Sequence, residues 1–177
     1  MSFISMRLHA FESFFSGPYL AFATKADEEG YGAVASLFRA AARAEQVHFE
    51  HHAKVIAELG EIPSANIEIP VVGTTKENLE AAVKGETYEK DIMYPEFLAQ
   101  AEKENIAGAI DAFEDAKAAE TVHAALYQNA LNNLEAGKGA KKDFFVCPVC
   151  GNVVESVIYL TNCPICKTET SKFMLVN

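Results

Sequence analysis

The sequence predicts a mainly α-helical protein, in which a four-helix bundle with a long crossover precedes a small β-rich domain. Four long stretches carry apolar residues at alternating spacings of three and four, which is typical of a buried helix face. A long segment with two prolines separates the second stretch from the third. All four cysteines fall between residues 147 and 166. We therefore expect a bundle at 1–137, a linker at 138–143 and a cysteine-rich domain at 144–177.

The four predicted helices form two hairpins. Short polar turns at residues 28–31 and 103–105 separate neighbouring helices, and such turns imply antiparallel packing. Between the hairpins, the segment GEIPSANIEIPVVGTT contains Pro63 and Pro70 and is expected to cross over without forming a helix. The segment AGKGAKK is expected to be a flexible tether. The predicted helices run from about Met6 to Glu28, from Ala33 to Leu59, from near Thr75, and from Asn105 to Leu134.

Composition limits the classes of function. The 177 residues are 50% hydrophobic, which is enough for one sizeable core and a small second domain. A net charge of -10 argues against binding to nucleic acid or to an anionic membrane surface. No run of about 18 apolar residues predicts a membrane span, and the first residues lack the features of a secretory signal. We therefore expect neither a membrane span nor secretion.

Two Glu-x-x-His motifs lie on the faces of the second and fourth helices that are expected to be buried. They are Glu45-x-x-His48 and Glu120-x-x-His123, and a spacing of three places Glu and His side by side on one helix face. In the second helix the motif continues the apolar series, and His52 follows one turn later. An unpaired buried carboxylate costs several kcal/mol, so each motif needs a partner. Two such motifs in one core indicate a shared metal centre.

The two remaining helices offer further carboxylates in register with these motifs. Ferritin-like bundles build a two-metal site from Glu-x-x-His on each of two helices and one Glu on each of the others. The third helix offers Glu86, with Glu89 one turn later, and the first offers Glu12. Pro18 leaves an alternative in which the first helix begins near this residue and Glu12 lies on a preceding segment. Oxygen ligands with one or two imidazoles suit Fe(II) or Mn(II) better than a soft metal, and bridging carboxylates would hold two such ions close together.

The cysteines form a second candidate metal site. Cys147-x-x-Cys150 and Cys163-x-x-Cys166 are separated by residues 151–162, and four thiolates at this spacing make a tetrahedral site. Zinc ribbons use the same pattern, so the spacing alone does not distinguish structural zinc from redox-active iron. An electron-transfer centre is useful beside a redox-active two-metal site, and this context favours one iron bound by the four cysteines.

With these motifs the sequence resembles rubrerythrin over nearly the whole chain. The resemblance rests on YLAFATKADEEGY, ASLFRAAARAEQVH, GETYEKDIMYPEF, AETVH and the cysteine tail. It implies a ferritin-like diiron bundle with a C-terminal rubredoxin-like domain. It also implies that Glu45 and Glu120 bridge the irons, and that Glu89 is an additional carboxylate that exchanges with a facing histidine when the oxidation state changes. The remaining implied ligands are Glu12, Glu86, His48 and His123. The residues implied to act in catalysis are Glu89, His48, Tyr19 and Tyr94. The two tyrosines are implied to act by donating hydrogen bonds to ligand carboxylates.

The resemblance implies a peroxidase that reduces hydrogen peroxide to water at the diiron site, with electrons relayed through the iron-thiolate centre. The implied metals are two non-haem iron ions in the bundle and one iron bound by the cysteines. The implied electron donor is a rubredoxin or an NAD(P)H-dependent reductase, and the implied location is the cytoplasm. The implied assembly is a homodimer or larger homo-oligomer, with the cysteine domain of one subunit near the diiron site of another. Two other classes remain open from the residues alone. One is a ferroxidase or iron-storage protein of the ferritin type, and the other is a zinc-ribbon adaptor on a structural bundle.

Overall fold

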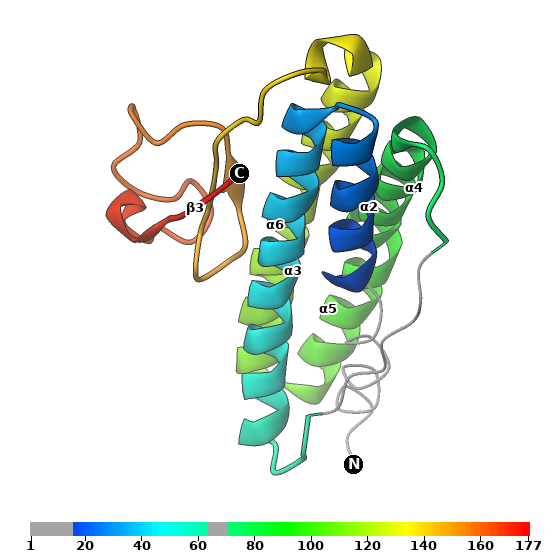
Figure 1. Cartoon of the computed structure of the whole chain (residues 1–177). Helices are drawn as coiled ribbons and strands as arrows, with labels where there is room; N and C mark the ends of the chain where they lie inside the picture. Colours follow the sequence, from blue (N-terminus) through cyan, green and yellow to red (C-terminus); the bar gives the residue numbers. More distant parts are fainter. Residues whose placement is uncertain (1–15, 64–70) are drawn as a thin grey trace.

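The computed structural model describes residues 16–63 and 71–177, so the predicted ligand Glu12 lies outside the described residues. Within these ranges the chain is mainly helical with a small antiparallel sheet near the C-terminus, which confirms the predicted fold class. Figure 1 shows α3 and α6 side by side, with the C-terminal part of the chain against one side of α3. No helix in the described ranges is both long enough and apolar enough to cross a membrane. The helical elements are α2 (Ser16–Glu28), α3 (Gly32–Glu58), α4 (Thr75–Tyr88), the π-helical turn η1 (Glu89–Met93), α5 (Tyr94–Glu104), α6 (Ala107–Asn132) and the short 3-10 helix η2 (Leu134–Gly137).

Two short turns join the helices into hairpins, at the places that the sequence predicted. Between α2 and α3, the Tyr31 N–H donates to the Ala26 carbonyl at 2.8 Å. Between α5 and α6, the Ile106 N–H donates to the Ala101 carbonyl at 3.0 Å. Both bonds reach back five residues, as in the Schellman motif, and they satisfy carbonyls that the end of a helix leaves without a partner.

The third helix begins where predicted but is not a single α-helix. The Thr74 side chain accepts from the Glu77 N–H and the Glu77 side chain accepts from the Thr74 N–H, which is a capping box. Beyond α4, one π-helical turn is closed by a bond from the Tyr94 N–H to the Glu89 carbonyl. Pro95 has no N–H with which to continue the regular ladder, which is a physical reason for a wider turn here. The turn places Glu89 and Tyr94 one above the other on the helix.

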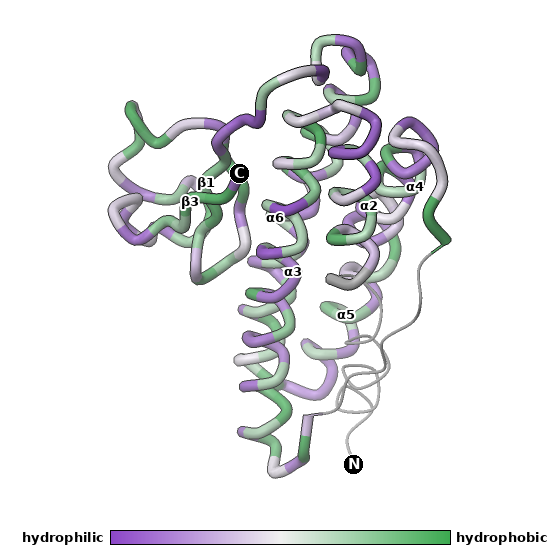
Figure 2. Tube along the Cα trace, in the orientation of Figure 1, coloured by the Kyte–Doolittle hydropathy of each residue, from purple (hydrophilic) through white to green (hydrophobic). Residues whose placement is uncertain are grey.

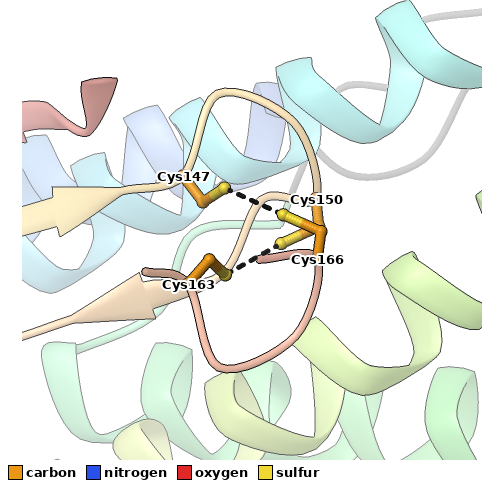
Figure 3. A group of neighbouring side chains, drawn as sticks. All are labelled: Cys147, Cys150, Cys163 and Cys166. Atoms are coloured by element: carbon orange, nitrogen blue, oxygen red, sulfur yellow. Dashed lines mark hydrogen bonds between the residues drawn. The ribbon is translucent and has the colours of Figure 1, made fainter. Parts of the chain in front are cut away.

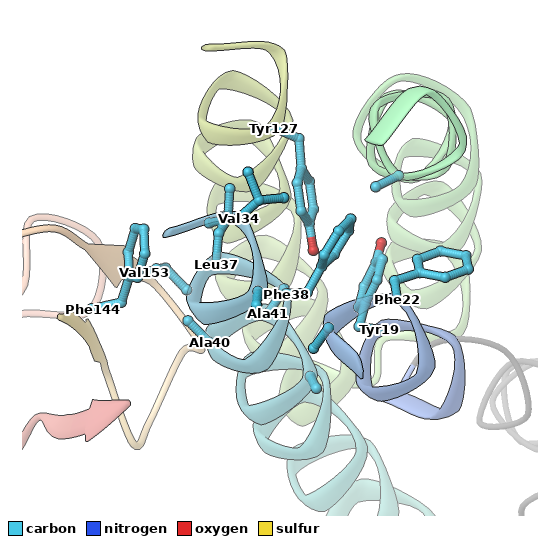
Figure 4. Packing of buried hydrophobic residues seen from close by; sticks show 14 of the residues in the cluster. Tyr19, Phe22, Val34, Leu37, Phe38, Ala40, Ala41, Tyr127, Phe144 and Val153 are labelled. Atoms are coloured by element: carbon cyan, nitrogen blue, oxygen red, sulfur yellow. The ribbon is translucent and has the colours of Figure 1, made fainter. Parts of the chain in front are cut away.

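Two apolar clusters fill the bundle, and a polar layer separates them along the helices. One cluster contains Tyr19, Phe22, Phe38 and Tyr127, whose neighbouring ring centroids lie 5.4–6.2 Å apart (Figure 4). The other surrounds Phe113 in the opposite half of the bundle. On α3, α4 with η1, and α6, the buried polar residues between the two clusters are all glutamates and histidines. The fold therefore places a polar layer inside an apolar interior.

The C-terminal residues 144–177, called the tail below, contain a three-stranded antiparallel sheet in the order β2–β1–β3. Figure 2 shows that β1 and β3 consist of hydrophobic residues. Phe144 and Val153 extend the first apolar cluster of the bundle into the tail, where Figure 4 shows them facing α3. The tail is therefore packed against the bundle of its own chain, whereas the resemblance implied a place near the diiron site of another subunit. Its strands are β1 (Phe144–Val146), β2 (Val153–Val154) and β3 (Met174–Val176), with a 3-10 turn, η3, at Thr170–Lys172.

The linker at 138–143, which lies in the segment expected to be a flexible tether, is bound to the bundle. The Gly139 N–H donates to the Gly30 carbonyl at 2.9 Å. The Lys142 N–H donates to the Ser36 hydroxyl oxygen at 3.2 Å. These bonds hold the linker along the start of α3 and set the direction in which the chain enters the tail.

Candidate metal centres

The predicted glutamates and histidines of the bundle lie together in the polar layer. They come from α3, from the junction of α4 with η1, and from α6. Each is at most 5% exposed, so these side chains are shielded from bulk water. The structure thus brings together all the predicted bundle ligands that fall within the described residues. They are Glu45, His48, Glu86, Glu89, Glu120 and His123.

Glu120 is at the centre of this group. Its Oε1 lies 2.9 Å from His48 Nδ1, and its Oε2 lies 2.7 Å from His123 Nδ1. Glu45 Oε2 lies 3.5 Å from His48 Nδ1, and Glu86 Oε2 lies 3.6 Å from His123 Nδ1. One ligand atom from each of Glu45, Glu86, Glu120 and His123 lies within 4.8 Å of the others, close enough to share a metal ion. A carboxylate with one oxygen toward each histidine has the arrangement required to bridge two ions.

Backbone carbonyls of the tail determine which ring nitrogen of His48 and His123 carries the proton. His48 Nε2 lies 3.1 Å from the Cys150 carbonyl oxygen, and His123 Nε2 lies 3.1 Å from the Gly151 carbonyl oxygen. A carbonyl only accepts, so each Nε2 carries a proton, and a neutral imidazole then has a lone pair on Nδ1. These lone pairs face carboxylate oxygens, which repel them unless a proton or a metal cation lies between. The two Nδ1 atoms are therefore oriented as metal ligands.

Some carboxylate oxygens of this group have no hydrogen-bond partner among the described residues. They are both oxygens of Glu89 and Oε1 of Glu45, whereas Oε2 of Glu86 and Oε1 of Glu120 face only a histidine Nδ1. A buried carboxylate without a partner costs several kcal/mol, whereas two divalent cations balance the charge of four carboxylates. A donor set of carboxylate oxygens and imidazole nitrogens is one that ferrous ion accepts. The residues present fit a two-iron site.

Two of the predicted catalytic residues are tyrosines that border the site. Tyr19 donates a hydrogen bond from its hydroxyl to Glu86 Oε1 at 2.6 Å. Tyr94 is fully buried, with its ring centroid 6.1 Å from that of His52. Burial, and then His48, lowers the pKa of His52 to about 3, so this histidine is a neutral packed residue. Burial and the negative charge of nearby glutamates raise the pKa of both phenols, which therefore remain protonated donors.

A third tyrosine, Tyr127, was not among the predicted site residues. It is fully buried beside Tyr19, with ring centroids 5.6 Å apart. Its hydroxyl has no hydrogen-bond partner within the described ranges. Burial, and then the negative charge of Glu86, raises the pKa of Tyr127, so its phenol lies within the electrostatic influence of the carboxylates. The signal that could have found it is its spacing of four from His123, which places both side chains on one helix face.

In the absence of a cation, bound protons neutralise part of the negative charge of the carboxylates in this layer. Burial, and then the negative charge of Glu120, raises the pKa of Glu45, Glu86 and Glu89. Burial also acts to raise the pKa of Glu120, but the two histidines outweigh it and lower that pKa. Burial acts to lower the pKa of His123, but Glu120 outweighs it and raises that pKa to about 10. Glu120 is therefore the carboxylate that stays ionised.

Metal in the carboxylate layer should stabilise the protein more at high pH than at low pH. The pKa values of Glu86, Glu89 and His123 are raised in the metal-free folded state, so these groups hold protons that the unfolded chain has already lost. The stability of the metal-free protein therefore falls as pH rises, and the contribution of His123 continues to fall up to a pH of about 10. The lowered pKa of Glu120 acts in the opposite direction, but only below the usual range of a glutamate. Metal ions displace these protons, so their affinity rises with pH. We expect calorimetry to show that the gain in Tm on loading the layer widens from about pH 5.5 to about pH 8. A constant gain across this range would contradict the assignment.

The four cysteines converge from two loops of the tail, as Figure 3 shows. Cys147 Sγ lies 3.5 Å from Cys166 Sγ, and Cys150 Sγ lies 3.6 Å from Cys163 Sγ. Ligands about 2.3 Å from one tetrahedral ion lie about 3.8 Å from each other, whereas a disulfide bond is about 2.05 Å long. The hydrogen bond between Cys147 and Cys150 lowers the pKa of Cys147 to about 5, so thiolate character is present before a metal binds. The four thiols fit one metal ion.

The loop from Cys147 to Gly151, called the first knuckle below, touches the carboxylate layer directly. Besides the two carbonyl contacts to the histidines, Gly151 has φ +73° and approaches His48 so closely that a Cβ would collide with Nε2. Glycine is needed here for both the backbone angle and the contact. This functional glycine was not predicted, although its position directly after Cys-x-x-Cys is visible in the sequence.

Comparisons with known proteins agree with this geometry. A family model for rubrerythrin matches residues 10–131. Nigerythrin from Nitratidesulfovibrio vulgaris is 36% identical over 149 residues, covering 84% of this chain and 72% of that protein. Rubrerythrin-1 from Clostridium acetobutylicum is 32% identical over 180 residues, covering 97% of this chain and 92% of that protein. The structure of nigerythrin in its fully reduced, all-ferrous state matches with a TM-score of 0.87 and 33% identity, covering 97% of this chain and 84% of that one.

The similarities and the two sets of donor atoms together identify the metals. The glutamates and histidines of the bundle form a diiron-carboxylate site, and the four cysteines of the tail form a rubredoxin-like iron site. These two sites make the protein an iron-binding oxidoreductase. The chain belongs to the rubrerythrin family.

Proposed function

We propose that this protein reduces hydrogen peroxide to water, with electrons that pass from the tail iron to the diiron site. The contact between the two sites supports this most directly, because the carbonyls of Cys150 and Gly151 lie 3.1 Å from Nε2 of His48 and His123. Reduction of one peroxide consumes two electrons and two protons and yields two water molecules. Two ferrous ions in the carboxylate layer supply both electrons when bound. The first knuckle offers a short hydrogen-bonded route by which electrons return to the layer.

The residues around the layer hold the ligands in place and keep bulk water out. The hydroxyl of Tyr19 holds one oxygen of Glu86, while the other oxygen faces His123. The carbonyls of the first knuckle hold both imidazoles by Nε2–H and so direct Nδ1 into the layer. The phenols of Tyr19 and Tyr94 at its border have raised pKa values, so they stay protonated and act as buried hydrogen-bond donors. These side chains keep the ligands ordered in an interior that excludes competing reactions with water.

Glu89 is suited to be the ligand that changes during turnover. It is fully buried, and neither oxygen has a hydrogen-bond partner in the described part of the chain. No competing hydrogen bond therefore has to break when this carboxylate moves toward or away from a cation. Its place on the π-helical turn, where the helix is wider, also gives its backbone a position that a regular helix lacks.

The proposed donor is a rubredoxin or an NAD(P)H-dependent reductase. Among the four cysteines Cys166 is partly exposed whereas the others are buried, so electrons enter at its edge of the tail. We also propose a homodimer or larger assembly, which exposed apolar side chains of the bundle support. These are Leu20, Tyr88 and Ile92.

Rapid mixing of the anaerobically reduced protein with hydrogen peroxide tests the function. We expect one peroxide to oxidise one diiron site, and to do so faster than dissolved oxygen at the same concentration. We also expect added ferrous iron to bind only to the sites described above. Faster oxidation by oxygen, with continuing uptake of iron, would instead establish the ferroxidase or storage function.

Replacement of Glu89 by alanine should slow peroxidase turnover about 10- to 100-fold, which is the range for losing a supporting group at a metal site. The remaining ligands still hold metal, and removal of a buried polar group without a hydrogen-bond partner offsets part of the cost of the cavity left behind, so the fold should survive with at most a modest loss of Tm. Steady-state turnover, iron content and Tm measure these effects. Glu102→Ala removes an exposed carboxylate near the end of α5, which continues from the π-helical turn, and should leave all three unchanged. Wild-type turnover in Glu89→Ala would refute the role assigned to Glu89.

A further inference from the structure

A buried carboxamide lies directly beside the four-cysteine site. Asn152 follows the first knuckle and is fully buried. Its side-chain Nδ2 lies 3.8 Å from Cys163 Sγ, within reach of an N–H···S hydrogen bond. Its backbone carbonyl accepts from the Cys147 N–H at 2.9 Å, which fixes the residue against the knuckle. Asn152 therefore holds an N–H donor at one sulfur from a rigid backbone.

Packing does not account for an asparagine at this position. The other end of the carboxamide, Oδ1, is buried and has no hydrogen-bond partner among the described residues. A buried acceptor without a partner disfavours folding, whereas a leucine of similar size has no polar group to satisfy. The feature that distinguishes asparagine from leucine here is the N–H that faces Cys163.

The chemistry of a thiolate also settles which end of the carboxamide faces the sulfur. A metal-bound sulfur is negatively charged and accepts hydrogen bonds. An amide nitrogen donates to it, whereas an amide oxygen would repel it. The orientation with Nδ2 toward Cys163 is the one that a metal-bound cysteine stabilises.

We propose that Asn152 raises the reduction potential of the tail iron through its hydrogen bond to Cys163. Reduction adds one electron to the iron-thiolate centre and increases the negative charge on its sulfurs. An N–H donor stabilises the reduced form more than the oxidised form, and hydrogen bonds to sulfur are a main determinant of such potentials. Asn152 thus makes the tail a better acceptor of electrons from the external donor.

A second side chain near the sulfurs shows why Asn152 should have the larger effect. The hydroxyl oxygen of Thr168 lies 3.2 Å from Cys166 Sγ. Both residues are partly exposed, so water can replace this hydroxyl if it is removed. Asn152 and Cys163 are both fully buried, and solvent cannot supply a substitute donor there.

The test is a redox titration of the visible absorption of the tail iron in Asn152→Leu and Asn152→Ala. Leucine keeps the branched shape of the side chain and alanine avoids overpacking, but both remove the donor. We expect the ratio of reduced to oxidised centre at a fixed potential to fall about tenfold, which equals about 59 mV for a one-electron couple. Asn177→Leu is the matched control, because it removes an exposed carboxamide that contacts Asp143 instead of a sulfur. Its potential should equal that of the wild type.

The proposal requires iron in the four-cysteine site. The relay role proposed above explains only why a raised potential would be useful, and the effect of Asn152 on the potential does not depend on it. Because the titration contains no peroxide, failure of the peroxidase function would not alter it. An unchanged potential in variants that retain their tail iron would overturn the proposal, even if their Tm fell. Loss of tail iron from both variants would overturn it as well, because Asn152 would then serve to hold the site together. A wild-type protein without ferric thiolate absorption would also refute it.

Discussion

Glu120→Gln should abolish iron binding in the bundle and leave the tail iron in place. Glutamine keeps the shape of the side chain but removes its charge, and one of the two oxygens becomes an NH₂ group that cannot bind metal. Because the two oxygens of Glu120 face His48 and His123 separately, the change affects both metal positions. We expect iron to fall from about three ions per chain to about one. Metal analysis with a visible spectrum measures this, since the thiolate absorption should persist.

The metal-free form of this variant provides an independent readout. The pairing of Glu120 with two histidines is fully buried, and removing one member of such a group costs roughly 3–5 kcal/mol. The Tm of metal-free Glu120→Gln should therefore lie well below that of the metal-free wild type. Glu114→Gln, an exposed position on the same helix, is the control and should change neither iron content nor Tm. Retention of all three irons in Glu120→Gln would show that Glu120 does not bridge the site.

Gly151→Ala should uncouple the two iron sites while both keep their metal. A Cβ at this position would collide with His48 Nε2 and would lie 3.2 Å from the Ala44 carbonyl oxygen, so the first knuckle has to move away from the bundle. Displacement of a positioning group by about 1 Å can slow a reaction on the order of 100-fold. We expect a comparable slowing of electron transfer from the reduced tail to the oxidised diiron site. Stopped-flow absorption at the tail chromophore, with a protein donor, measures the rate.

A second glycine separates this collision from backbone strain. Gly60 also has positive φ, at +81°, but a Cβ there would meet nothing within 4 Å. Alanine in the left-handed region costs about 1–2 kcal/mol at either position. Gly60→Ala should therefore lower Tm through backbone strain as Gly151→Ala does, but it should leave electron transfer unchanged. Equal rates in both variants would show that the contact between knuckle and histidine does not carry the electrons.

The bundle and its ligands could be predicted because local patterns encode them. The series of apolar residues in α3 is interrupted by Glu45 and His48 at positions that must face the interior, and the same holds for Glu120 and His123 in α6. A charged residue on a core face needs a partner wherever the fold places it, so the chemistry follows from the pattern. For Tyr19, the family resemblance implied a hydrogen bond to a ligand carboxylate, and in the structure its hydroxyl donates to Glu86.

The π-helical turn at Glu89–Met93 was not predicted, and a single α-helix was expected there. Pro95 was a visible signal, but a proline in a helical segment can also end the helix or kink it. Choosing among these outcomes requires knowledge of the packing. The burial of Met93, Tyr94 and Phe97 against α6 holds the chain in a continuous helix, so the backbone accommodates the proline by widening one turn.

Sequence alone determined the two sets of ligands, because ligand identity and spacing are local properties of a helix face or a Cys-x-x-Cys loop. It also determined that the helices pair as hairpins, because short turns leave no other arrangement. Only the tertiary structure decided how the two sites meet. The contact of the Cys150 and Gly151 carbonyls with His48 and His123 joins residues about a hundred and about thirty positions apart, and it depends on how the linker, β1 and α3 pack. No local pattern encodes a contact of that kind, because its energy comes from surfaces that exist only after the bundle and the tail have folded.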